Sequence, residues 1–566
     1  AWLAENLWWH YQYTGDTNYL ATVAYPLMKG AAEFFQDFLV PHPDHSDWLV
    51  TCPSYSSEHN WKSGSVEVAN VPGPTMDNEL IRELCDYLIQ STQILGIDAE
   101  FRTNLVTLRA KLPPDQIGRF GQLQEWLEDV DSPNDTHRHC SHLVGLYPGE
   151  TISPYYTPAL AAAAKISTDA RCSNPSGDIG WGHAWRIGLQ ARLQNNYYTY
   201  LFATNLLQRH VSTNLMFTDV NNRQVDGIFG ALGGIAETML QSTWGELHLL
   251  PALPSKWSNG SVTGLRARGG FEVAIAWTNN QLASAEIKSL LGHRCRIRSR
   301  WPIDIKRGAT FIEAPMVYPG VYEFPTDAGA TYTVSPATLF ETETLAASPS
   351  VGDAHSEFIN SGFSHFRGTR LTANASGDFI SYNVTNVPAG KWRVRVVANC
   401  DTNSGRFQLR AGPAGSLTDI GPVFDTYCAT NIAGLYPSNG LTAQIMWTNM
   451  LREFDCGIWI APTNGTYEFR FGVTDKNAAS SGYALSFDYI ELVPAPAAPE
   501  LNASAWNGNL ILSWPTSAEI YGLEYAETLS NSIWHPVLTA PVVAGNELII
   551  TNPMTSGAAF FRLHKP

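Results

Sequence analysis

The hydrophobic periodicity of the chain changes near residue 246, and this change divides it into two kinds of structure. Before that point apolar residues recur at helical spacing, as in residues 2–11, which is the pattern of a helix with one buried face. After it, short alternating runs such as residues 271–277 and 285–288 are separated by Asn or Gly turns, which is typical of strands. The sequence therefore predicts a helical first part followed by all-β structure.

A chain of 566 residues is too long for one hydrophobic core, so several domains are expected. The hydrophobic pattern and the linker stretches predict a helical domain at 1–245 and a β-sandwich at 246–336. A second β domain at 341–494 and a small β domain at 500–566 follow, on either side of a Pro/Ala linker.

The helical part has long polar connections at residues 51–74, 131–147 and 173–180, and loops of that length usually carry function. An α/α toroid, in which paired helices form a ring around a cleft walled by loops, fits this alternation. The helices expected in its later part are 158–168, 182–193, 198–211 and 234–241.

The overall charge restricts the partners of the protein. The formal net charge is −16, which repels nucleic acid and anionic lipid. No apolar run is long enough to cross a bilayer, so membrane insertion is not expected. The 18 Trp and 23 Tyr suit sugar binding, because pyranose rings stack on aromatic faces, although most such residues fill cores.

The eight cysteines form no CxxC pairs, so neither a zinc ribbon nor a thioredoxin-like motif is predicted. Three of them, Cys400, Cys428 and Cys456, lie within one stretch. One disulfide among these three is possible in an oxidising compartment.

The polar loops of the helical part hold the groups that could perform chemistry. Glycoside hydrolysis needs one carboxyl group to protonate the departing oxygen and a second group to activate water or attack. An isolated acid is more often a helix cap or a structural hydrogen-bond partner, so the residues alone leave the pairing open. The candidates are Glu58, His59, Glu125, Arg138, His139 and Asp226.

Eight segments between residues 1 and 335 resemble, in order and spacing, the inverting α-L-fucosidases of glycoside hydrolase family 95. The resemblance implies an α/α six-fold barrel, incomplete at its N-terminus, followed by a β-sandwich. It also implies hydrolysis of terminal α-L-fucosyl linkages with inversion, on fucosylated oligo- or polysaccharides, without a catalytic cofactor. The segments are 1–3, 13–16, 24–28, 75–78, 121–126, 137–143, 249–254 and 264–270.

The resemblance also assigns roles to single residues. The general acid of the family matches Glu58, although Ser57 stands where the family has Pro. The acid that supports water activation through an amide matches Asp226, with Ile228 in place of the usual Asn.

The sugar-binding positions of the family match Arg138 and His139, and Trp2 is expected to line the same pocket. Glu125 is the second choice for the catalytic acid, because the resemblance gives it a structural or subsite role. The alternative that His137, His139 and His142 bind a metal is less favoured, because no zincin-type carboxylate accompanies them.

The water-activating Asn pair of the family lies upstream of the position that matches Ala1. We therefore expect residues 1–566 on their own to hydrolyse fucosides poorly or not at all. Two alternative functions stay open. One is an α-L-galactosidase, because L-galactose differs from L-fucose by one hydroxyl. The other is a glycan-binding relic without activity.

The two later β regions also resemble known modules. Residues 341–494 are similar to family 6 jelly-roll carbohydrate-binding modules, in which acids at the positions of Glu343 and Asp488 often hold a structural Ca²⁺. Both residues are equally well read as ordinary surface acids. Residues 500–566 resemble fibronectin-type-III-like tails of secreted bacterial enzymes, which predicts a secreted, cell-surface or periplasmic bacterial protein.

Overall fold

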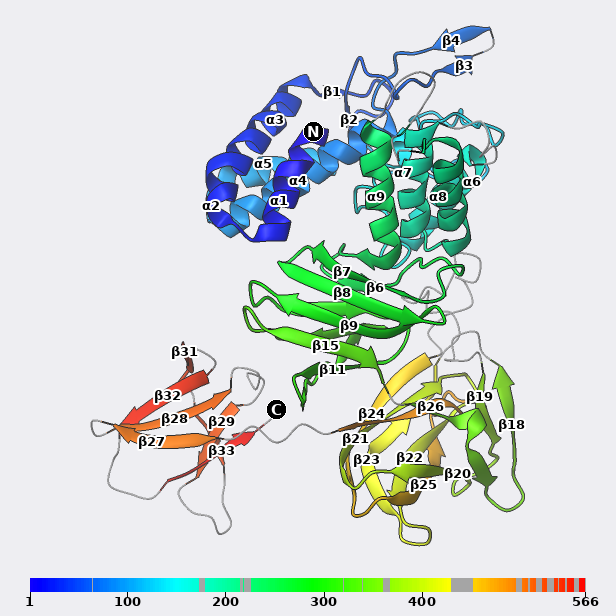
Figure 1. The fold of residues 1–566 in the computed structure, drawn as a ribbon, viewed down its shortest axis with the longest axis vertical. Coiled ribbons are helices and arrows are strands. Elements are labelled where there is room, and N and C mark those ends of the chain that lie inside the picture. Colours follow the sequence, from blue (N-terminus) through cyan, green and yellow to red (C-terminus); the bar gives the residue numbers. More distant parts are fainter. Residues whose placement is uncertain are drawn as a thin grey trace.

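The structure is a computed structural model. It describes residues 1–566 except 64, 173–178, 214–216, 218–224, 319, 338, 360–366, 429–450, 495–500, 507–508, 516–521, 527–533, 538, 545–546, 554–558 and 565–566. Helices occupy one end of the molecule, a β-sandwich its middle and two further β units its other end (Figure 1).

The helices pack as two groups, α1–α5 and α6–α9, each around its own apolar core (Figure 1). In the described part of the chain the two groups stand over the β-sandwich without closing a ring. The helices are α1 (Trp2–Thr14), α2 (Thr17–Tyr19), α3 (Tyr25–Phe38), α4 (Thr75–Leu95), α5 (Ala99–Ala110), α6 (Pro158–Arg171), α7 (Gly180–Arg192), α8 (Asn196–Arg209) and α9 (Val225–Met239). Short strands β1 (Val40–Pro41), β2 (Leu49–Val50), β3 (Trp61–Ser63) and β4 (Val66–Val68) lie between α3 and α4.

Helix α9 begins nine residues earlier than the sequence pattern predicted. The sequence analysis placed Asp226 in a polar loop, but the glycines of this segment allow close packing of a helix. A Cβ at Gly227 would lie 2.8 Å from the Phe217 ring, and one at Gly234 would lie 3.0 Å from Ile187 on α7. The tight contact between α7 and α9 therefore outweighs the low helix propensity of glycine.

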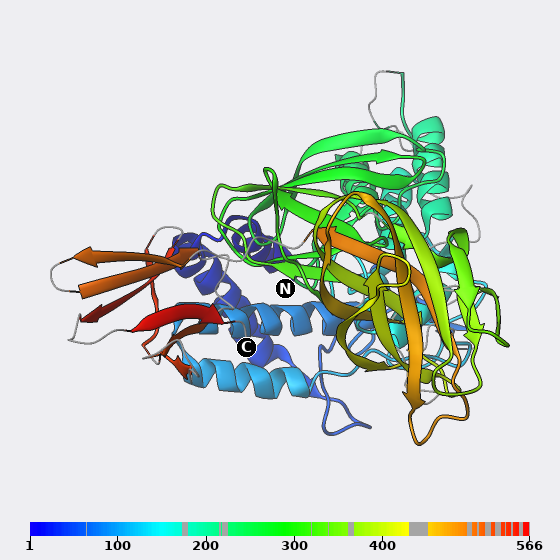
Figure 2. The same cartoon turned by 90° about the horizontal axis from the view of Figure 1, so that it is seen from below.

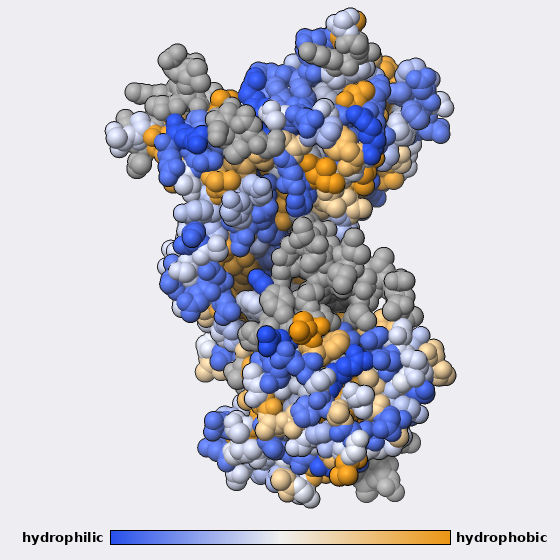
Figure 3. Space-filling model, turned by 90° about the vertical axis from the view of Figure 1, so that its right-hand side faces the viewer, coloured by the Kyte–Doolittle hydropathy of each residue, from blue (hydrophilic) through white to orange (hydrophobic). Residues whose placement is uncertain are grey.

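Two helices carry exposed apolar residues at helical spacing. Val225, Phe229 and Leu232 of α9 are exposed, as are Leu27 and Phe34 of α3. Figure 3 shows a mostly hydrophilic face interrupted by hydrophobic patches, the broadest of them toward the helical end. Apolar stripes of this kind on a helix usually pack against another surface.

The β-sandwich begins directly where α9 ends, because β5 starts at Leu240. The sequence pattern placed this boundary six residues later. One sheet has the order β13-β14-β10-β6-β5 and the other β12-β11-β15-β9-β8-β7. The strands are β5 (Leu240–Gln241), β6 (Leu247–Leu249), β7 (Gly260–Ala267), β8 (Phe271–Thr278), β9 (Gln281–Ser289), β10 (Cys295–Arg298), β11 (Ile303–Arg307), β12 (Thr310–Phe311), β13 (Met316–Tyr318), β14 (Val321–Phe324) and β15 (Thr331–Pro336).

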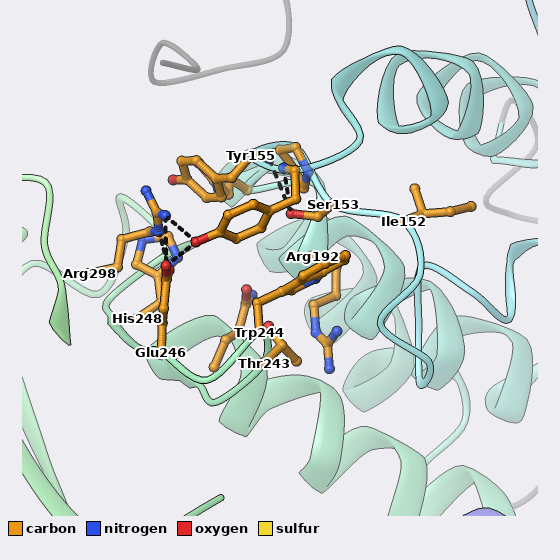
Figure 4. Close-up of a pocket in the computed structure, with 13 residues that line it drawn as sticks. Ile152, Ser153, Tyr155, Arg192, Thr243, Trp244, Glu246, His248 and Arg298 are labelled. Atoms are coloured by element: carbon orange, nitrogen blue, oxygen red, sulfur yellow. Dashed lines mark hydrogen bonds and ion pairs between the residues drawn. The ribbon is translucent and has the colours of Figure 1, made fainter. Parts of the chain in front are cut away.

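A buried Glu–Arg pair joins α6–α9 to the sandwich. Arg298 Nε donates to Glu246 Oε2 at 2.7 Å, the Tyr156 hydroxyl also binds Glu246, and the Arg298 guanidinium lies 3.8 Å from the Tyr155 ring centre (Figure 4). The cavity beside them has a volume of about 30 Å³, which holds one or two water molecules and no sugar. This joint is structural.

A second joint connects α1 to the sandwich through the segment 264–270. Arg268 Nε donates to Gln12 Oε1 at 2.9 Å, and Gly269 N donates to Gln12 O at 2.8 Å. The Arg268 guanidinium also lies against the rings of Trp9 and Tyr13. This Arg-Gly-Gly segment therefore docks the helices on the sandwich.

The third unit is a pair of antiparallel sheets, β18-β19-β26-β21-β24 and β17-β20-β25-β22-β23, around one core. Residues near 336–350, which the sequence pattern left weakly structured, supply its first strands. The strands are β16 (Leu339–Glu341), β17 (Ala346–Pro349), β18 (Ala354–Ile359), β19 (Arg367–Thr372), β20 (Phe379–Val387), β21 (Gly390–Asn399), β22 (Gly405–Gly412), β23 (Thr418–Asp425), β24 (Leu451–Ala461), β25 (Gly465–Lys476) and β26 (Leu485–Pro494).

The tail unit projects to one side of the molecule, away from the third unit (Figure 2). Its two sheets have the orders β27-β28-β32-β31 and β30-β29-β33. The strands are β27 (Asn502–Trp506), β28 (Asn509–Pro515), β29 (Gly522–Ala526), β30 (His535–Pro536), β31 (Val542–Ala544), β32 (Glu547–Pro553) and β33 (Phe560–His564).

None of the helices in the described ranges is long and apolar enough to cross a membrane. The eight cysteines lie in the described part of the chain and form no disulfide there. The disulfide considered possible among Cys400, Cys428 and Cys456 is therefore not formed in this structure, where all three thiols are buried within the β unit.

Candidate active site

Glu58 lies at the surface of the loop between β2 and β3, next to the segment that carries Arg138 and His139. The Glu58 side chain is 62% exposed, and its Oε2 contacts the Arg138 guanidinium and lies 3.2 Å from His139 Nε2. The structure therefore brings together three residues that the sequence named and that lie about 80 positions apart.

The charge of Glu58 is fixed by these neighbours. The hydrogen bond from His139, together with the charge of Arg138, lowers the pKa of Glu58 below its ordinary value. Burial lowers the pKa of His139, although Glu58 partly opposes this. Near neutral pH Glu58 is therefore a carboxylate, paired with Arg138 and a neutral His139.

The loop that carries Glu58 is held from below at two places. Asp77, in the first turn of α4, accepts hydrogen bonds from Thr51 at 2.6 Å and Ser54 at 2.5 Å. Ser56 Oγ donates to Glu125 Oε1 at 2.5 Å. Glu58 itself has a φ of 50°, a left-handed conformation that is unusual outside glycine, so these anchors hold a strained turn.

Glu125 is the centre of a buried cluster beneath this loop. Its side chain is 1% exposed, and Arg171 donates to its Oε2 at 2.5 Å. His59 Nδ1 lies 2.9 Å from the same oxygen, and Ser141 Oγ lies 3.5 Å from Oε1. Burial alone would raise the pKa of Glu125, but Arg171 and His59 hold it well below its usual range. Glu125 is therefore a permanent carboxylate, which no general acid can be.

His59 lies between two carboxylates. Its Nε2 is 3.1 Å from Asp135 Oδ2, opposite the Glu125 contact. Burial disfavours the charged ring, yet the hydrogen bonds with Asp135 and Glu125 raise the pKa of His59 to about 9. Burial would raise the pKa of Asp135, but the hydrogen bond with His59 and the charge of Arg171 lower it to about 2. His59 is therefore an imidazolium near neutral pH.

Three histidine rings connect this buried cluster with Glu58. The His59 and His137 ring centres are 4.3 Å apart with an angle of 8° between the planes, and those of His137 and His139 are 5.2 Å apart. Burial and the charge of His59 lower the pKa of His137 to about 4. The row therefore has one charged ring at its buried end and neutral rings at its exposed end.

Asp226 lies in the first turn of α9, where its Oδ1 accepts a hydrogen bond from Gly227 N at 3.0 Å. A Cβ at Gly227 would lie 3.4 Å from Trp181 N, and the Trp181 ring centre is 4.7 Å from that of His139. Asp226 is thus connected to Glu58 through Gly227, Trp181 and His139.

The other sequence candidates lie elsewhere. Trp2 is on α1, where it is 37% exposed, and none of the polar or ring contacts of the described residues joins it to Glu58 or Arg138. His142 is fully buried, and burial lowers its pKa to about 3. The described residues contain no group of three His, Cys, Asp or Glu arranged to hold a metal, so the three histidines of segment 137–143 are not placed as a ligand set.

Glu343 and Asp488 lie next to each other in the third unit. Thr342 Oγ1 donates to Phe487 O at 2.7 Å and to Asp488 O at 2.9 Å, which places the two segments in contact. Glu343 Oε2 is buried without a hydrogen-bond partner among the described residues, and Asp488 is 2% exposed. Asp488 is therefore not a surface acid, whereas Glu343 is partly exposed and has one buried oxygen.

The sequence analysis missed the residues that support the site. Arg171 ends α6 on the same buried face as Ala161, Ala164 and Thr168. An arginine at a buried position of a helix must have a carboxylate partner, and this spacing was the available signal. Asp135 had no signal, because it lies in an irregular loop.

Both parts of the helical and sandwich region resemble known families. Residues 1–240 match the glycosyl hydrolase family 95 catalytic domain, and residues 241–334 match the glycoside hydrolase family 95 C-terminal domain. The boundary between these matches coincides with the junction of α9 and β5.

The curated relatives of the chain agree with the family 95 match. The chain is 38% identical over 300 residues to alpha-L-fucosidase 2 of Arabidopsis thaliana, a match that covers 50% of this chain and 34% of that protein. It is 31% identical over 299 residues to probable alpha-fucosidase A of Aspergillus niger, which covers 50% of this chain and 37% of that protein. The chain spans about a third of the length of the curated relatives it matches.

Solved structures are less similar. A Paenibacillus xanthan lyase has a TM-score of 0.24 at 17% identity, covering 52% of this chain and 34% of that one. A family 35 carbohydrate binding module from Clostridium thermocellum has a TM-score of 0.19 at 17% identity, covering 28% of this chain and 98% of that one. Likenesses at these TM-scores carry no inference.

Proposed function

The chain belongs to glycoside hydrolase family 95 over residues 1–334, and on this premise we propose that it supplies the acid and the sugar-binding wall of an inverting α-L-fucosidase. The proposed substrate is a glycan with a terminal α-L-fucosyl residue. In this proposal the two helical groups are parts of a six-fold toroid.

Glu58 is the proposed general acid. The observation that carries this assignment is the contrast within one cluster. Glu125 and Asp135 are largely buried and held as carboxylates by Arg171 and His59, whereas Glu58 faces solvent with Arg138 and His139 beside it. Of these three acids, Glu58 is the one that a glycosidic oxygen can reach.

A general acid must carry a proton in the complex with substrate, and Glu58 is ionised without it. Sugar hydroxyls that bind Arg138 and His139 would take these partners away from Glu58, and the bound sugar would exclude water. Both changes raise a carboxyl pKa, and catalytic hydrogen bonds often form only with substrate. Glu58 would therefore take up its proton as the sugar binds.

Inversion requires water to be activated on the opposite face of the sugar from the acid. We assign Asp226 to support this step, since it is connected to Glu58 through Gly227, Trp181 and His139. The amide that would contact the water belongs, by the family resemblance, to a segment upstream of Ala1. Activity is therefore tested in a version of the chain that extends upstream through that segment.

The test is Glu58→Gln in the extended version. We expect hydrolysis of 2'-fucosyllactose to fall by about 10²–10⁴-fold, the usual contribution of proton donation. An aryl α-L-fucoside with a good leaving group should lose much less, because its oxygen departs without a proton.

Glu67→Gln on the neighbouring strand β4 is the matched control and should leave both rates unchanged. An equal loss on both substrates after Glu58→Gln would remove the acid role from Glu58. Normal hydrolysis of 2'-fucosyllactose by Glu58→Gln would show that Glu58 takes no part in hydrolysis.

For the third unit we propose carbohydrate binding, with Glu343 and Asp488 as oxygen ligands of a structural Ca²⁺. The support is the buried Oε2 of Glu343, which has no partner among the described residues, because an unpaired buried carboxylate is costly. Calcium takes carboxylate and carbonyl oxygens, and both are present here. The tail unit is proposed as a spacer in a secreted or cell-surface bacterial enzyme.

A further inference from the structure

Glu125 contacts both loops that form the candidate site, from below and out of reach of a ligand. The first loop carries Glu58 and reaches Glu125 through Ser56 at 2.5 Å and His59 at 2.9 Å. The second carries Arg138 and His139 and reaches it through Ser141 at 3.5 Å. The hydroxyls of Ser56 and Ser141 are also 2.8 Å apart, so the two loops meet at this carboxylate.

Arg171 strengthens the same connection. Its guanidinium donates to Glu125 Oε2 at 2.5 Å and to the backbone oxygen of His139 at 3.0 Å. It is also 3.2 Å from Asp135 Oδ2. One buried cation thus links Glu125 to the backbone of the residue that hydrogen-bonds Glu58.

The separation of Glu58 from Arg138 and His139 is therefore set beneath the site and not at the surface. Exposed pairs such as Glu58 and Arg138 are weak and mobile. A buried carboxylate with several charged and hydroxyl donors has a single low-energy arrangement. The rigid part of the site is the cluster, and the exposed side chains follow it.

We propose that Glu125 is the positioning residue of this site, holding the Glu58 loop and the Arg138–His139 loop at a fixed separation. Glu125 never contacts the sugar. This inference deepens the proposed function, on which it rests only for the identity of the ligand. The contacts between the loops are independent of that identity.

The experiment uses the chain itself, with Glu125→Gln and, as a matched control, Glu128→Gln, which makes the same change at an exposed position three residues along the same segment. The first readout is the titration of the histidine rings by NMR, with each signal assigned by substitution of its residue. The second is binding of a fucose-configured iminosugar, measured by calorimetry.

We expect Glu125→Gln to move the titration of His59 from about 9 toward the ordinary value of about 6.5. The signals of His137 and His139 on the second loop should shift as well. Iminosugar binding should weaken by about 10²-fold, the usual effect of misplacing groups by about 1 Å. In the extended version kcat should fall more than KM changes. Glu128→Gln should change none of these.

A merely local role for Glu125 predicts a different pattern. If His59 alone shifts while His139 and iminosugar binding stay as in the wild type, Glu125 holds one loop and the proposal is wrong. If the wild-type chain does not bind the iminosugar while the rings of both loops still shift, the positioning role stands and the proposed ligand is wrong.

Should Glu125→Gln not fold, Ser56→Ala and Ser141→Ala give the same test with single hydrogen bonds removed. Each should weaken iminosugar binding by about tenfold, and Glu125→Asp should keep the raised pKa of His59 while weakening binding less than Glu125→Gln. Wild-type affinity in both serine variants would overturn the proposal.

Discussion

The molecule contains two buried Glu–Arg pairs with similar chemistry and different surroundings. Glu125 and Arg171 lie beneath the candidate site, and Glu246 and Arg298 lie at the joint between the helices and the sandwich. All four side chains are at most 8% exposed. The first pair is surrounded by histidines and serines of two loops. The second is surrounded by Tyr155, Tyr156 and a cavity for one or two waters.

The difference shows that a buried ion pair does not by itself identify a functional site. The chemistry of the pair is the same in both places, so burial and charge alone do not identify a functional site. What differs is whether the pair supports groups that face solvent. The Glu125 cluster supports Glu58, Arg138 and His139, whereas the Glu246 pair supports only the packing of two domains.

Removing each cation should therefore produce different losses. Arg171→Met and Arg298→Met each leave a buried carboxylate behind, which costs about 3–5 kcal/mol of stability. Only Arg171→Met should also abolish iminosugar binding under conditions where the protein is folded, and Arg298→Met should bind normally. Denaturant unfolding and calorimetry measure the two effects. Loss of binding in Arg298→Met would remove the distinction between the clusters.

His59 of the first cluster should contribute to the pH dependence of stability. The folded pKa of His59 is raised to about 9, so its contribution is fully present below about pH 6.5 and is lost as pH rises through about 9. The loss is on the order of 3 kcal/mol.

Urea unfolding at pH 6 and pH 9.5, for the wild type and His59→Gln, measures this loss. The comparison separates His59 from Glu5, Glu83 and Glu491, whose pKa values burial raises to about 9, 7 and 8. An equal loss of stability in both proteins would show that His59 is not charged between Glu125 and Asp135.

Glu343 sharpens the comparison, because its buried Oε2 has no arginine partner among the described residues. If Ca²⁺ takes that place at Glu343, a tenfold excess over its Kd should stabilise the protein by about 1.4 kcal/mol. A chelator should remove this increment, and Glu343→Gln should abolish the response. Identical melting of the wild type with calcium and with chelator would leave Glu343 without a metal.

The sequence predicted those features that depend on local pattern. The change from helices to strands was correct, and so was the hairpin around Asn279 and Asn280, both of which have positive φ. The start of α9 was wrong, because Gly227 and Gly234 are there for close contact with Phe217 and Ile187. Contacts of that kind are not visible in a local pattern.

The candidate site was predicted only at its surface. Glu58, Arg138 and His139 came from segments that resemble a family, and the structure brings them together. The cluster beneath them depends on Arg171, 46 residues from Glu125, and on Asp135. Partners at such separations depend on tertiary packing, which a single sequence does not encode by spacing. The sequence analysis named Glu125 as a second choice for the catalytic acid. Its place at the centre of the buried cluster could not be predicted without these partners.

The direct junction of α9 with β5 has a mechanical consequence. Helix α9 has 15 residues, which makes it about 22 Å long, and it passes into the sandwich at Leu240 with no flexible residue between them. It therefore works as a lever, with Asp226 at one tip and its pivot in the sandwich sheet. A change of tilt of about 5° at that pivot would move Asp226 by roughly 2 Å over this length. Distant substitutions that repack the sandwich should thus move Asp226, the acid proposed to support water activation.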